Sequence, residues 1–402
     1  MDNDGIRMYG TTWCIDCKRA KKFFGEHRVR YQFIDVEEDQ GGLRIVEKVN
    51  RGKRIVPTIL FPDGSVMVEP SNADLAAKLG LQTSPSCPYY DLIIIGGGPA
   101  ALTAALYTAR EKIETLVVER SALGGQAGVT ERIDNYPGFP EGVTGAEFAE
   151  RLVQQCRQFG VEMLSATEVT AMGLDGEDCW VGFANGQRAS CRAILLAPGS
   201  KYRRLGVPGE EDFIGAGVHF CATCDGPFYK DQEVLVVGGG NSAVEEAVFL
   251  TKFARKVNIA YRGTQLTASA VAREKALASP KIAVHYETVV AEFRGKARLS
   301  SVVIRNVRTG ETNEVACSGV FVFIGLEPNT KWLKGSVELD DMGFIVTDSS
   351  FRTNMPNVFA AGDARKGSTK QLVSAAGEGA ASALMIRHFL QSAKVLPSSR
   401  ND

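Results

Sequence analysis

The sequence of 402 residues has no long hydrophobic run, no excess of charge and few cysteines for its length. Its longest apolar stretches, such as residues 92–95, have the length of a strand, whereas a membrane-spanning helix needs about 18 or more apolar residues. Lys and Arg number 46 against 47 Asp and Glu, so the charge balance indicates neither nucleic acid nor a membrane surface as a partner. The first residues are acidic and lack the apolar segment of a signal peptide. We therefore expect a soluble, cytoplasmic protein.

The nine cysteines are too few for a disulfide scaffold, but four of them form two CxxC pairs, Cys14/Cys17 and Cys221/Cys224. In a reducing compartment such pairs are catalytic or bind a metal. A zinc site needs four ligands, and neither pair has a further cluster of Cys or His near it in the sequence. A two-residue spacer at the start of a helix brings two sulfurs within bonding range, so we expect two redox dithiols and no metal.

Two glycine-rich turns form an internal repeat. Residues 92–101 and 235–243 each hold an apolar strand, three consecutive glycines and the start of a helix. Both fit the G-x-G-x-x-[GA] fingerprint of dinucleotide-binding sites, whose glycines let backbone amides approach a pyrophosphate at the positive end of the helix. Two bound dinucleotides are therefore predicted. Their contacts are expected from Gly96, Gly98, Pro99 and Ala100 in the first turn and from Gly238, Gly240, Asn241 and Ser242 in the second.

The residue that ends the second strand of each repeat distinguishes the two ligands. In the first repeat this residue is Glu119, which is placed to accept the hydroxyl hydrogens of an adenosine ribose. In the second repeat Tyr261 stands at this place, with Arg262 beside it. A neutral ring and a guanidinium suit a 2′-phosphate better than a bare ribose. The first turn is thus predicted to bind FAD and the second NADPH.

Further segments resemble two known families. Residues 91–392 are similar to low-molecular-weight thioredoxin reductases through both glycine turns, residues 124–126 (GGQ), 135–140 (NYPGFP), 221–226 (CATCDG) and 359–363 (FAAGD). Residues 5–80 resemble a glutaredoxin or mycoredoxin through residues 13–17 (WCIDC) and the segment around Pro57, a proline that is usually cis. The whole resembles natural fusions of a glutaredoxin-like domain with a thioredoxin reductase-like flavoprotein.

This resemblance implies an α/β chain in which a thioredoxin-like (glutaredoxin) domain, residues 1–82, precedes two Rossmann-like three-layer domains. A linker, residues 83–90, leads to a discontinuous FAD domain, residues 91–203 and 331–402, into which an NAD(P)H domain, residues 204–330, is inserted. The residues 82–88 have linker composition and can span about 20–25 Å when extended. The resemblance also implies a homodimer. It adds as FAD contacts Gly125, Gln126, Asn135, Gly362, Asp363, Lys370, Gln371 and Leu372.

The resemblance further implies an order of electron transfer. NADPH reduces the flavin, which gives two electrons to the second dithiol, with Cys224 facing the flavin, Cys221 attacking the outgoing disulfide and Asp225 as general acid and base. Cys14 of the fused domain then forms a mixed disulfide with Cys221, which Cys17 resolves. The final substrate stays open among a peroxiredoxin, a thioredoxin-like acceptor, protein mixed disulfides and low-molecular-weight thiol disulfides.

Three departures from the family patterns leave alternatives open. Four places that hold His, Arg, Arg and a further Arg in thioredoxin reductases are held here by Tyr261, Arg262, Gly263 and Thr267. NADH, ferredoxin or another flavoprotein is therefore an alternative donor. The Gly-Gly pair with which glutaredoxins often hold glutathione is not evident after Pro57, and Asp16 places a negative charge near Cys14. A rival of another class is a flavin-binding redox sensor. His219, near Cys221, is expected to pack rather than to move protons.

Overall fold

The computed structural model describes residues 5–395 except residues 28, 129, 131–132 and 134. The chain divides into two compact units. The first comprises Met1–Val129, Gly145–Gly199 and Pro328–Asp402, and the second comprises Thr130–Thr144 and Ser200–Glu327. Residues 130–144, which the sequence-based division places in the FAD domain, thus group with the second unit. Across the described ranges, no helix combines the length and the apolar character that crossing a bilayer requires.

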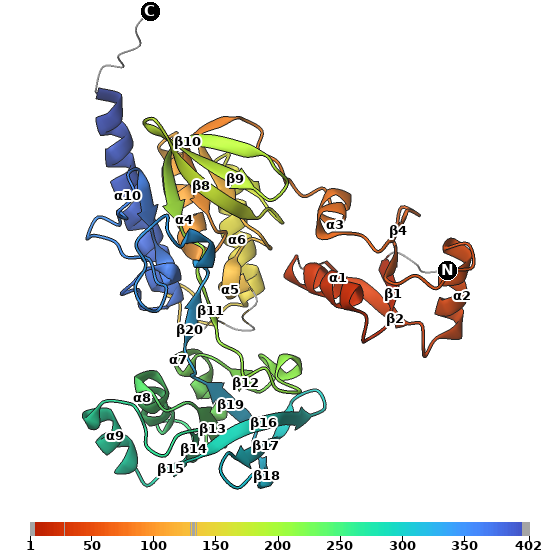
Figure 1. The fold of residues 1–402 in the computed structure, drawn as a ribbon, viewed down its shortest axis with the longest axis vertical. Coiled ribbons are helices and arrows are strands. Elements are labelled where there is room, and N and C mark those ends of the chain that lie inside the picture. The colour runs from red at the N-terminus through yellow and green to blue at the C-terminus, as the bar shows by residue number, and fades with distance from the viewer. Residues whose placement is uncertain (1–4, 28, 129, 131–132, 134, 396–402) are drawn as a thin grey trace, which may run out of the picture. The chain divides into compact units, whose positions relative to one another are not determined.

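The N-terminal part of the first unit is a small α/β domain with a four-stranded sheet (Figure 1). Its elements are β1 (Ile6–Gly10), α1 (Ile15–Glu26), β2 (Tyr31–Asp35), α2 (Gln40–Val49), β3 (Thr58–Leu60), β4 (Val66–Val68) and α3 (Asn72–Lys78). The strand order is β2-β1-β3-β4. Successive residues of β1 face opposite sides, so Met8 packs with α1 and α3 whereas Tyr9 packs with α2. Pro57 is cis, as the resemblance implies.

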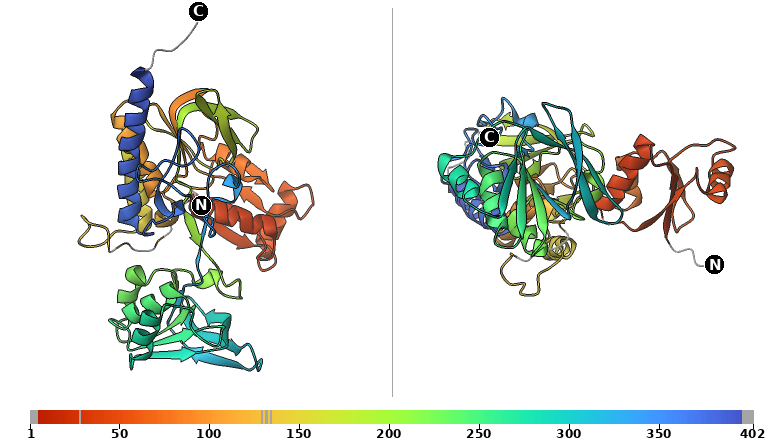
Figure 2. Two further views of the ribbon diagram at one scale, coloured as in Figure 1. Left: turned by 60° about the vertical axis from the view of Figure 1, so that its left-hand side comes forward. Right: turned by 90° about the horizontal axis from the view of Figure 1, so that it is seen from below.

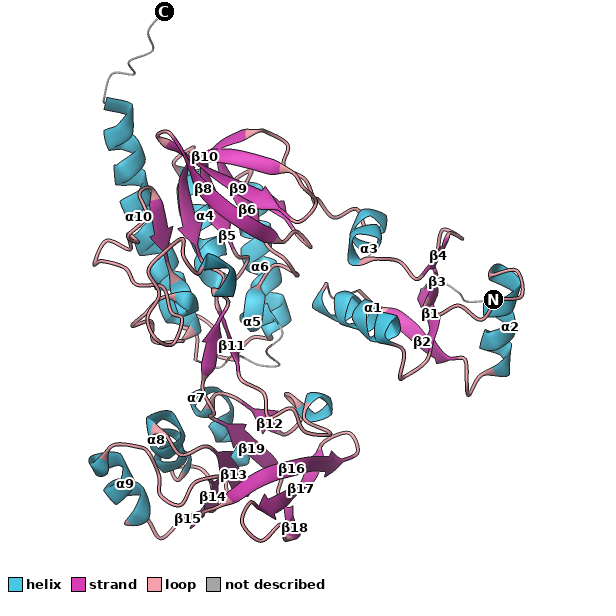
Figure 3. Ribbon diagram, viewed as in Figure 1, coloured by secondary structure: helices cyan, strands magenta, loops and turns pink. Residues whose placement is uncertain are grey.

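The rest of the first unit is built on a seven-stranded sheet (Figure 3). Its strands are β5 (Tyr89–Ile95), β6 (Thr115–Val118), β7 (Glu162–Leu164), β8 (Val169–Asp175), β9 (Asp178–Phe183), β10 (Arg188–Leu196) and β21 (Val358–Ala360). Its helices are α4 (Pro99–Arg110), α5 (Gly125–Gly128), α6 (Gly145–Gln158) and α10 (Leu372–Val395). Ile94 packs with α4, α6 and α10, whereas its neighbour Ile93 packs with β8 and β9. Helices, parallel strands and the antiparallel pair therefore form three layers.

The second unit repeats this plan on a five-stranded parallel sheet. The sheet contains β12 (Val218–His219), β13 (Glu233–Val237), β14 (Lys256–Ala260), β15 (Ile282–His285) and β19 (Gly319–Val322). Around it lie α7 (Ala222–Asp225), the 3-10 helix η2 (Gly226–Tyr229), α8 (Asn241–Leu250), α9 (Ala270–Leu277) and the sheet of β16 (Thr288–Gly295), β17 (Leu299–Asn306) and β18 (Thr312–Ala316). Val236 faces the helices and Val237 faces β16–β18, which Figure 2 shows as separate layers. The predicted fold class is confirmed.

Smaller elements complete the two units. The strands β11 (Ser200–Tyr202) and β20 (Leu326–Pro328) pair with each other. Short 3-10 helices are η1 (Glu211–Phe213), η3 (Lys331–Leu333) and η4 (Gly362–Ala364). In the N-terminal domain, α3 begins with a capping box, because Ser71 and Asp74 each accept from the other's backbone N–H.

The segment that follows the N-terminal domain, which the sequence predicts to be a short linker, is docked onto the seven-stranded sheet. The carboxylate of Glu162, at the start of β7, accepts from Gln82 Nε2 (2.6 Å), from the N–H and Oγ of Ser86 (2.7 and 2.6 Å) and from Tyr90 Oη (2.8 Å). The N–H of Ser165 donates to the carbonyl of Gln82 at 3.0 Å. Strand β5 then starts at Tyr89, inside the predicted linker. One carboxylate thus holds both ends of the connecting segment.

Replacing Glu162 by Ala should release this segment. Hydrogen bonds to a charged group contribute about 1.5–3 kcal/mol each, and several share this acceptor. We expect the amide hydrogens of residues 83–87 to exchange with deuterium at least tenfold faster, measured by mass spectrometry of peptic peptides. Glu147→Ala is the matched control, since the exposed carboxylate of Glu147 pairs with Arg151 one turn further along α6. Equal exchange in both variants would contradict the docking.

Candidate active site

The first dithiol lies at the start of α1. Cys14 is the N-cap of this helix, and its Sγ accepts from the N–H of Cys17 at 3.2 Å. The thiol of Cys14 donates to the carbonyl of Val56, the residue before the cis proline, at 3.6 Å. Cys14 is half-buried, whereas Cys17 is fully buried, and both are free thiols. One sulfur can therefore meet an incoming disulfide while the other lies behind it.

Burial makes the two sulfurs chemically unequal. Burial, reinforced by the hydrogen bond with Cys14, raises the pKa of Cys17 from 9.0 to about 12. A backbone N–H of Thr11 and the charge of Lys21 act in the opposite direction but do not offset it. Because the thiolate is the attacking form, Cys17 is a poor nucleophile toward solutes. This supports Cys14 as the first sulfur to react.

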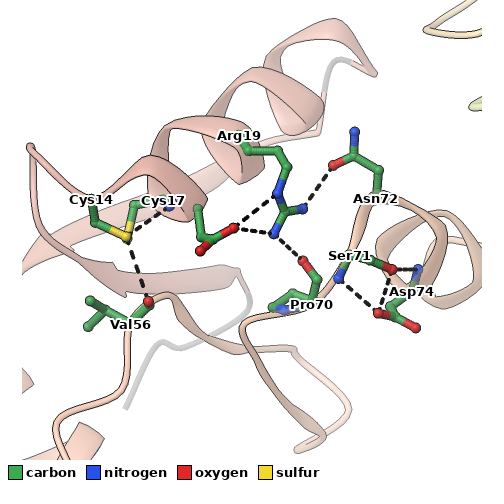
Figure 4. A network of polar contacts seen from close by, with 9 residues as sticks. Cys14, Cys17, Arg19, Val56, Pro70, Ser71, Asn72 and Asp74 are labelled. Carbon is green, nitrogen blue, oxygen red and sulfur yellow. Dashed lines mark hydrogen bonds and ion pairs between the residues drawn. The ribbon is translucent and has the colours of Figure 1, made fainter.

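An arginine network neutralises the negative charge next to the first dithiol (Figure 4). Arg19 donates to Asp16 Oδ1 from Nε and Nη2 (3.3 and 3.1 Å). It also donates to the carbonyl of Pro70 (2.8 Å) and to Asn72 Oδ1 (3.1 Å). The side chain of Asp16 is therefore paired with Arg19, and Arg19 connects α1 to the N-terminus of α3. No local sequence pattern predicts this network, since its ends lie more than fifty residues apart.

Two exposed apolar side chains flank Cys14. Trp13 is 64% exposed and Ile15 is 82% exposed. The indole N–H of Trp13 donates to both carboxylate oxygens of Glu37 at 3.1 Å, which fixes the ring beside the thiol. The sequence analysis used Trp13 only as part of a motif. An exposed aromatic side chain next to an attacking cysteine is typical of a surface that receives another protein or peptide.

The second dithiol lies at the start of α7. Cys221 directly precedes this helix and is in a disulfide. Asp225 is the last residue of the helix, and its N–H donates to the carbonyl of Cys221 at 3.1 Å. Its carboxylate is about one-fifth exposed and lies 3.4 Å from Nδ1 of His219. Cys224 belongs to the same helical turn, but its side chain falls outside the described residues.

The first glycine turn is shaped by close backbone approach. Gly96 has φ +115°, and a Cβ there would lie 2.1 Å from the carbonyl oxygen of Ala197. A Cβ on Gly97 would lie 2.8 Å from Cβ of Glu119, whose carboxylate accepts from the N–H of Gly97 at 2.6 Å. Helix α4 follows with Gly98 as its N-cap, which brings no side chain to the first-turn N–H groups. These groups are left for an anionic ligand such as a pyrophosphate.

The second glycine turn has the same construction with a different strand-end residue. Gly238 has φ +138°, and a Cβ there would lie 2.4 Å from the carbonyl oxygen of Phe323. The ring of Tyr261 lies where a Cβ on Gly239 would be, at 2.3 Å. Tyr261 thus occupies the structural place of Glu119, as the repeat predicts. The N-cap Gly240 of α8 again leaves the helix start open.

The neighbourhood of this second turn contains one free cation. Arg262 is exposed and forms no ion pair with any residue that the structure describes. Thr267, which replaces a family arginine, donates its N–H and Oγ to the carbonyl of Gly239 at 2.8 and 3.2 Å. Thr267 therefore closes the turn instead of reaching a phosphate. Of the two other predicted contacts, Asn241 accepts from the N–H of Ser269 at 2.7 Å and Ser242 is exposed.

A buried acid in the first unit fits the flavin nucleotide. Asp363 lies in η4, and its Oδ1 is buried without a hydrogen-bond partner among the described residues. Burial raises the pKa of this carboxyl group. Nζ of Lys370 donates to the carbonyls of Asp363 and Arg365 at 2.6 and 3.1 Å, and burial lowers its pKa. An unsatisfied acceptor of this kind suits a ligand hydroxyl, which would supply the missing donor.

The remaining residues that are predicted to contact FAD lie in different parts of the chain. Gly125 has φ +55° and lies against the first turn, since its Cβ would be 3.0 Å from Cα of Gly98. The exposed Gln126 follows in α5. Asn135 is exposed and belongs to the second compact unit. Its role stays a prediction. The others lie at or near η4 and α10: Gly362, Gln371 and Leu372.

Comparison with known proteins places these features in a family. A model of the pyridine nucleotide-disulphide oxidoreductases matches residues 90–379, and a glutaredoxin model matches residues 6–66. A thioredoxin reductase of Peptoclostridium acidaminophilum is 42% identical over 310 residues, covering 75% of this chain and 97% of that protein. The Bacillus subtilis enzyme is 38% identical over 305 residues, covering 75% and 95%. The solved thioredoxin reductase of Streptococcus pyogenes superimposes with a TM-score of 0.73 at 40% identity, over 76% of this chain and all of that one.

Two glycine-turn nucleotide sites together with a disulfide at a helix start define a nucleotide-dependent disulfide reductase. The chain belongs to the pyridine nucleotide-disulphide oxidoreductase family, and its N-terminal part is a glutaredoxin domain. FAD and NADPH are the cofactors of the thioredoxin reductases to which it is similar, and both glycine turns and Asp363 fit such ligands.

The unequal burial of the first dithiol predicts selective alkylation. The shift of the Cys17 pKa from 9.0 to about 12 leaves roughly a thousandfold less thiolate than an ordinary thiol has at neutral pH. With the chain fully reduced, iodoacetamide at pH 8 should label Cys14 at least a hundredfold faster than Cys17, as measured by peptide mass spectrometry. In guanidinium chloride the two rates should converge. Equal rates in the folded protein would refute the assigned order of the sulfurs.

Proposed function

We propose that this reductase delivers its electrons to its own glutaredoxin domain, in the order Cys221/Cys224 and then Cys14/Cys17. The observation that supports the proposal is that one chain contains two cysteine pairs whose surroundings differ. One has Cys221 in a disulfide at the start of the short helix that Asp225 ends. The other has a half-exposed Cys14 in front of a buried Cys17. Two cysteine pairs that can exchange a disulfide are therefore parts of one chain.

The exchange balances in two steps. The Cys221 thiolate attacks Sγ of Cys14, the Cys14–Cys17 bond breaks, and Cys17 takes up a proton. Cys224 then attacks Sγ of Cys221 in the mixed disulfide, which releases Cys14 as a thiol and restores the Cys221–Cys224 bond. Resolution by Cys17, as the resemblance was taken to imply, would return both electrons to the donor. Electron balance thus assigns the resolving role in this step to Cys224.

The direction of transfer is favourable. Thioredoxin-like dithiols have potentials near about −270 mV and glutaredoxins near roughly −200 to −230 mV, so outward transfer of two electrons gains about 2–3 kcal/mol. Cys17 becomes the resolving sulfur only in the next reaction, when Cys14 attacks a substrate disulfide. Its burial favours this order, because Cys17 is reached by a sulfur bound to Cys14 and not by solutes.

The cofactors enter this scheme through residues of the two turns. When bound, NADPH and FAD supply the electron pair that reduces the Cys221–Cys224 disulfide. We assign the FAD contacts to Gly96, Gly98, Pro99, Ala100, Glu119, Gly125, Gln126, Asn135, Gly362, Asp363, Lys370, Gln371 and Leu372. We assign the NADPH contacts to Gly238, Gly240, Asn241, Ser242 and Arg262. The open helix starts at Pro99 and Asn241 and the unsatisfied Oδ1 of Asp363 support these assignments.

The final substrates follow from the exposed surface beside Cys14. Trp13 and Ile15 favour a protein or peptide disulfide, such as a mixed disulfide, a peroxiredoxin or a thioredoxin-like acceptor. A low-molecular-weight thiol disulfide is the second candidate.

We further infer a homodimer that acts in the cytoplasm, on the strength of the similarity to thioredoxin reductases. A flavin-binding redox sensor is the rival. Rapid loss of flavin absorbance on addition of NADPH distinguishes the reductase from it.

The relay predicts a specific covalent intermediate. In a Cys17→Ser, Cys224→Ser double variant both resolving sulfurs are absent, so mild oxidation with diamide should accumulate a Cys14–Cys221 disulfide, detected by mass spectrometry. Adding Cys14→Ser should abolish the link. Mixing chains with different affinity tags distinguishes a link within one chain from a link between two. Absence of the link in both forms would exclude the relay.

The nucleotide preference rests on Arg262. Loss of a hydrogen bond to a charged group costs about 1.5–3 kcal/mol, which corresponds to roughly tenfold or more in binding. Arg262→Gln should therefore raise KM for NADPH about tenfold and leave KM for NADH unchanged in steady-state assays. Arg255→Gln is the control, because Arg255 is an exposed arginine of the same unit that pairs with Glu233. A wild-type enzyme that reacts faster with NADH would favour the alternative donor.

A further inference from the structure

A buried histidine lies between the acid of the second dithiol and a tyrosine. His219 is the last residue of β12 and is 7% exposed. Its Nδ1 lies 3.4 Å from Oδ2 of Asp225, and its Nε2 lies 2.6 Å from Oη of Tyr229. Its ring packs tilted against Phe321 of the adjacent strand β19, with centroids 5.4 Å apart. The sequence analysis expected packing, and the burial agrees, but the two polar contacts were missed.

The position of this histidine is firmly determined. Tyr229, at the end of η2, is 8% exposed, and its ring lies where a Cβ on Gly319 would be, at 2.3 Å. The rings of His219, Tyr229 and Phe321 contact one another at centroid distances of 5.3 to 5.5 Å. A side chain held between two rings loses little further freedom when it binds a carboxylate.

The partners determine the direction of the hydrogen bonds. A carboxylate only accepts, so a neutral imidazole that pairs with Asp225 must carry its hydrogen on Nδ1. Nε2 is then the acceptor, and the phenol of Tyr229 must donate to it. The chain of donors runs from Tyr229 through His219 to Asp225. The contact at the carboxylate is an ion-pair distance of 3.4 Å, which is longer than a typical N–H···O hydrogen bond.

We propose that His219, oriented by Tyr229, is a positioning residue that holds the carboxylate of Asp225 in the orientation in which it accepts a proton. This rests on the proposed role of Asp225 as acid and base. When Cys221 attacks a disulfide, the proton of its thiol moves to Asp225 and the sulfur electron pair forms the new S–S bond. The leaving sulfur departs with the electrons of the broken bond. Before transfer, the N–H of His219 stabilises the carboxylate.

Other titratable groups lie near His219, and they must stay the same in all variants whose pH profiles are compared. Strand β19, on which His219 and Tyr229 pack, carries only Gly, Val and Phe residues. Helix α8 packs against α7 and carries Glu245 and Glu246. Burial, with a smaller contribution from Glu245, raises the pKa of Glu246. These two carboxyl groups are unchanged in the variants below, so differences between profiles report on His219 and its two partners.

The kinetic test measures Cys221 directly. The full chain, with Cys14 and Cys87 replaced by Ser, is reduced and mixed with 5,5′-dithiobis(2-nitrobenzoic acid) between pH 5.5 and 9. His219→Leu should slow the reaction at pH 7 by roughly 10- to 100-fold, because the carboxylate then lacks the N–H that orients it for proton transfer. His219→Asn, which retains a donor near the place of Nδ1, should stay within about threefold of the parent. Tyr229→Phe should fall between the two.

The outcomes separate this inference from the function on which it rests. If Asp225→Asn leaves the rate unchanged, the acid–base role itself is wrong. If Asp225→Asn slows the reaction but His219→Leu and His219→Asn behave alike, the positioning role is overturned. An independent readout is the tautomer: ¹⁵N spectra of the histidine-labelled chain, assigned by His219→Asn, should show hydrogen on Nδ1 of His219. Hydrogen on Nε2 alone would overturn the inference without any kinetic measurement.

Discussion

The nucleotide sites depend on one steric constraint, the approach of a neighbouring strand to each glycine turn. The carbonyl oxygens of Ala197 and Phe323 lie at the points where Gly96 and Gly238 would carry a Cβ. Because the strands come this close, the chain must turn with positive φ and the following helix must start directly beneath the turn. The first-turn N–H groups of α4 and α8 are then left without side-chain caps. Backbone packing alone thus creates two anion-binding sites, and the strand-end residues Glu119 and Tyr261 distinguish them.

Burial has a comparable role in the chemistry of sulfur. In the N-terminal domain the core surrounds Cys17 and leaves Cys14 at the helix start, so the order of reaction is determined by packing. At the second centre the distinguishing feature is polar. A carboxylate one helical turn after Cys221 lies beside a histidine whose other nitrogen is bound by a buried phenol. Burial thus distinguishes the two sulfurs of the first centre, whereas at the second centre we propose that a proton acceptor, Asp225, has the corresponding role.

Much of this could be predicted from the sequence because it is encoded locally. The glycine turns, the two CxxC pairs, the capping box at Ser71 and the alternation of apolar residues in the strands are all short patterns. Contacts between distant segments could not be predicted in this way. Arg19 meets Pro70, Gln82 meets Glu162, and His219 meets a tyrosine beyond the CxxC motif, and no periodicity links these positions. The grouping of residues 130–144 with the second unit likewise depends on tertiary packing.

The docked connecting segment changes how the N-terminal domain can move. The N–H of Leu81 still bonds within this domain, to the carbonyl of Ala76, whereas the carbonyl of Gln82 already bonds to the next one. The two anchors are adjacent residues, so no slack chain separates them. Reorientation of the dithiol must then occur by rotation about a few backbone bonds or by breaking the contacts to Glu162. The rate of this reorientation should therefore be limited by an activation barrier and increase with temperature accordingly. It should not be limited by diffusion of a domain on a flexible linker.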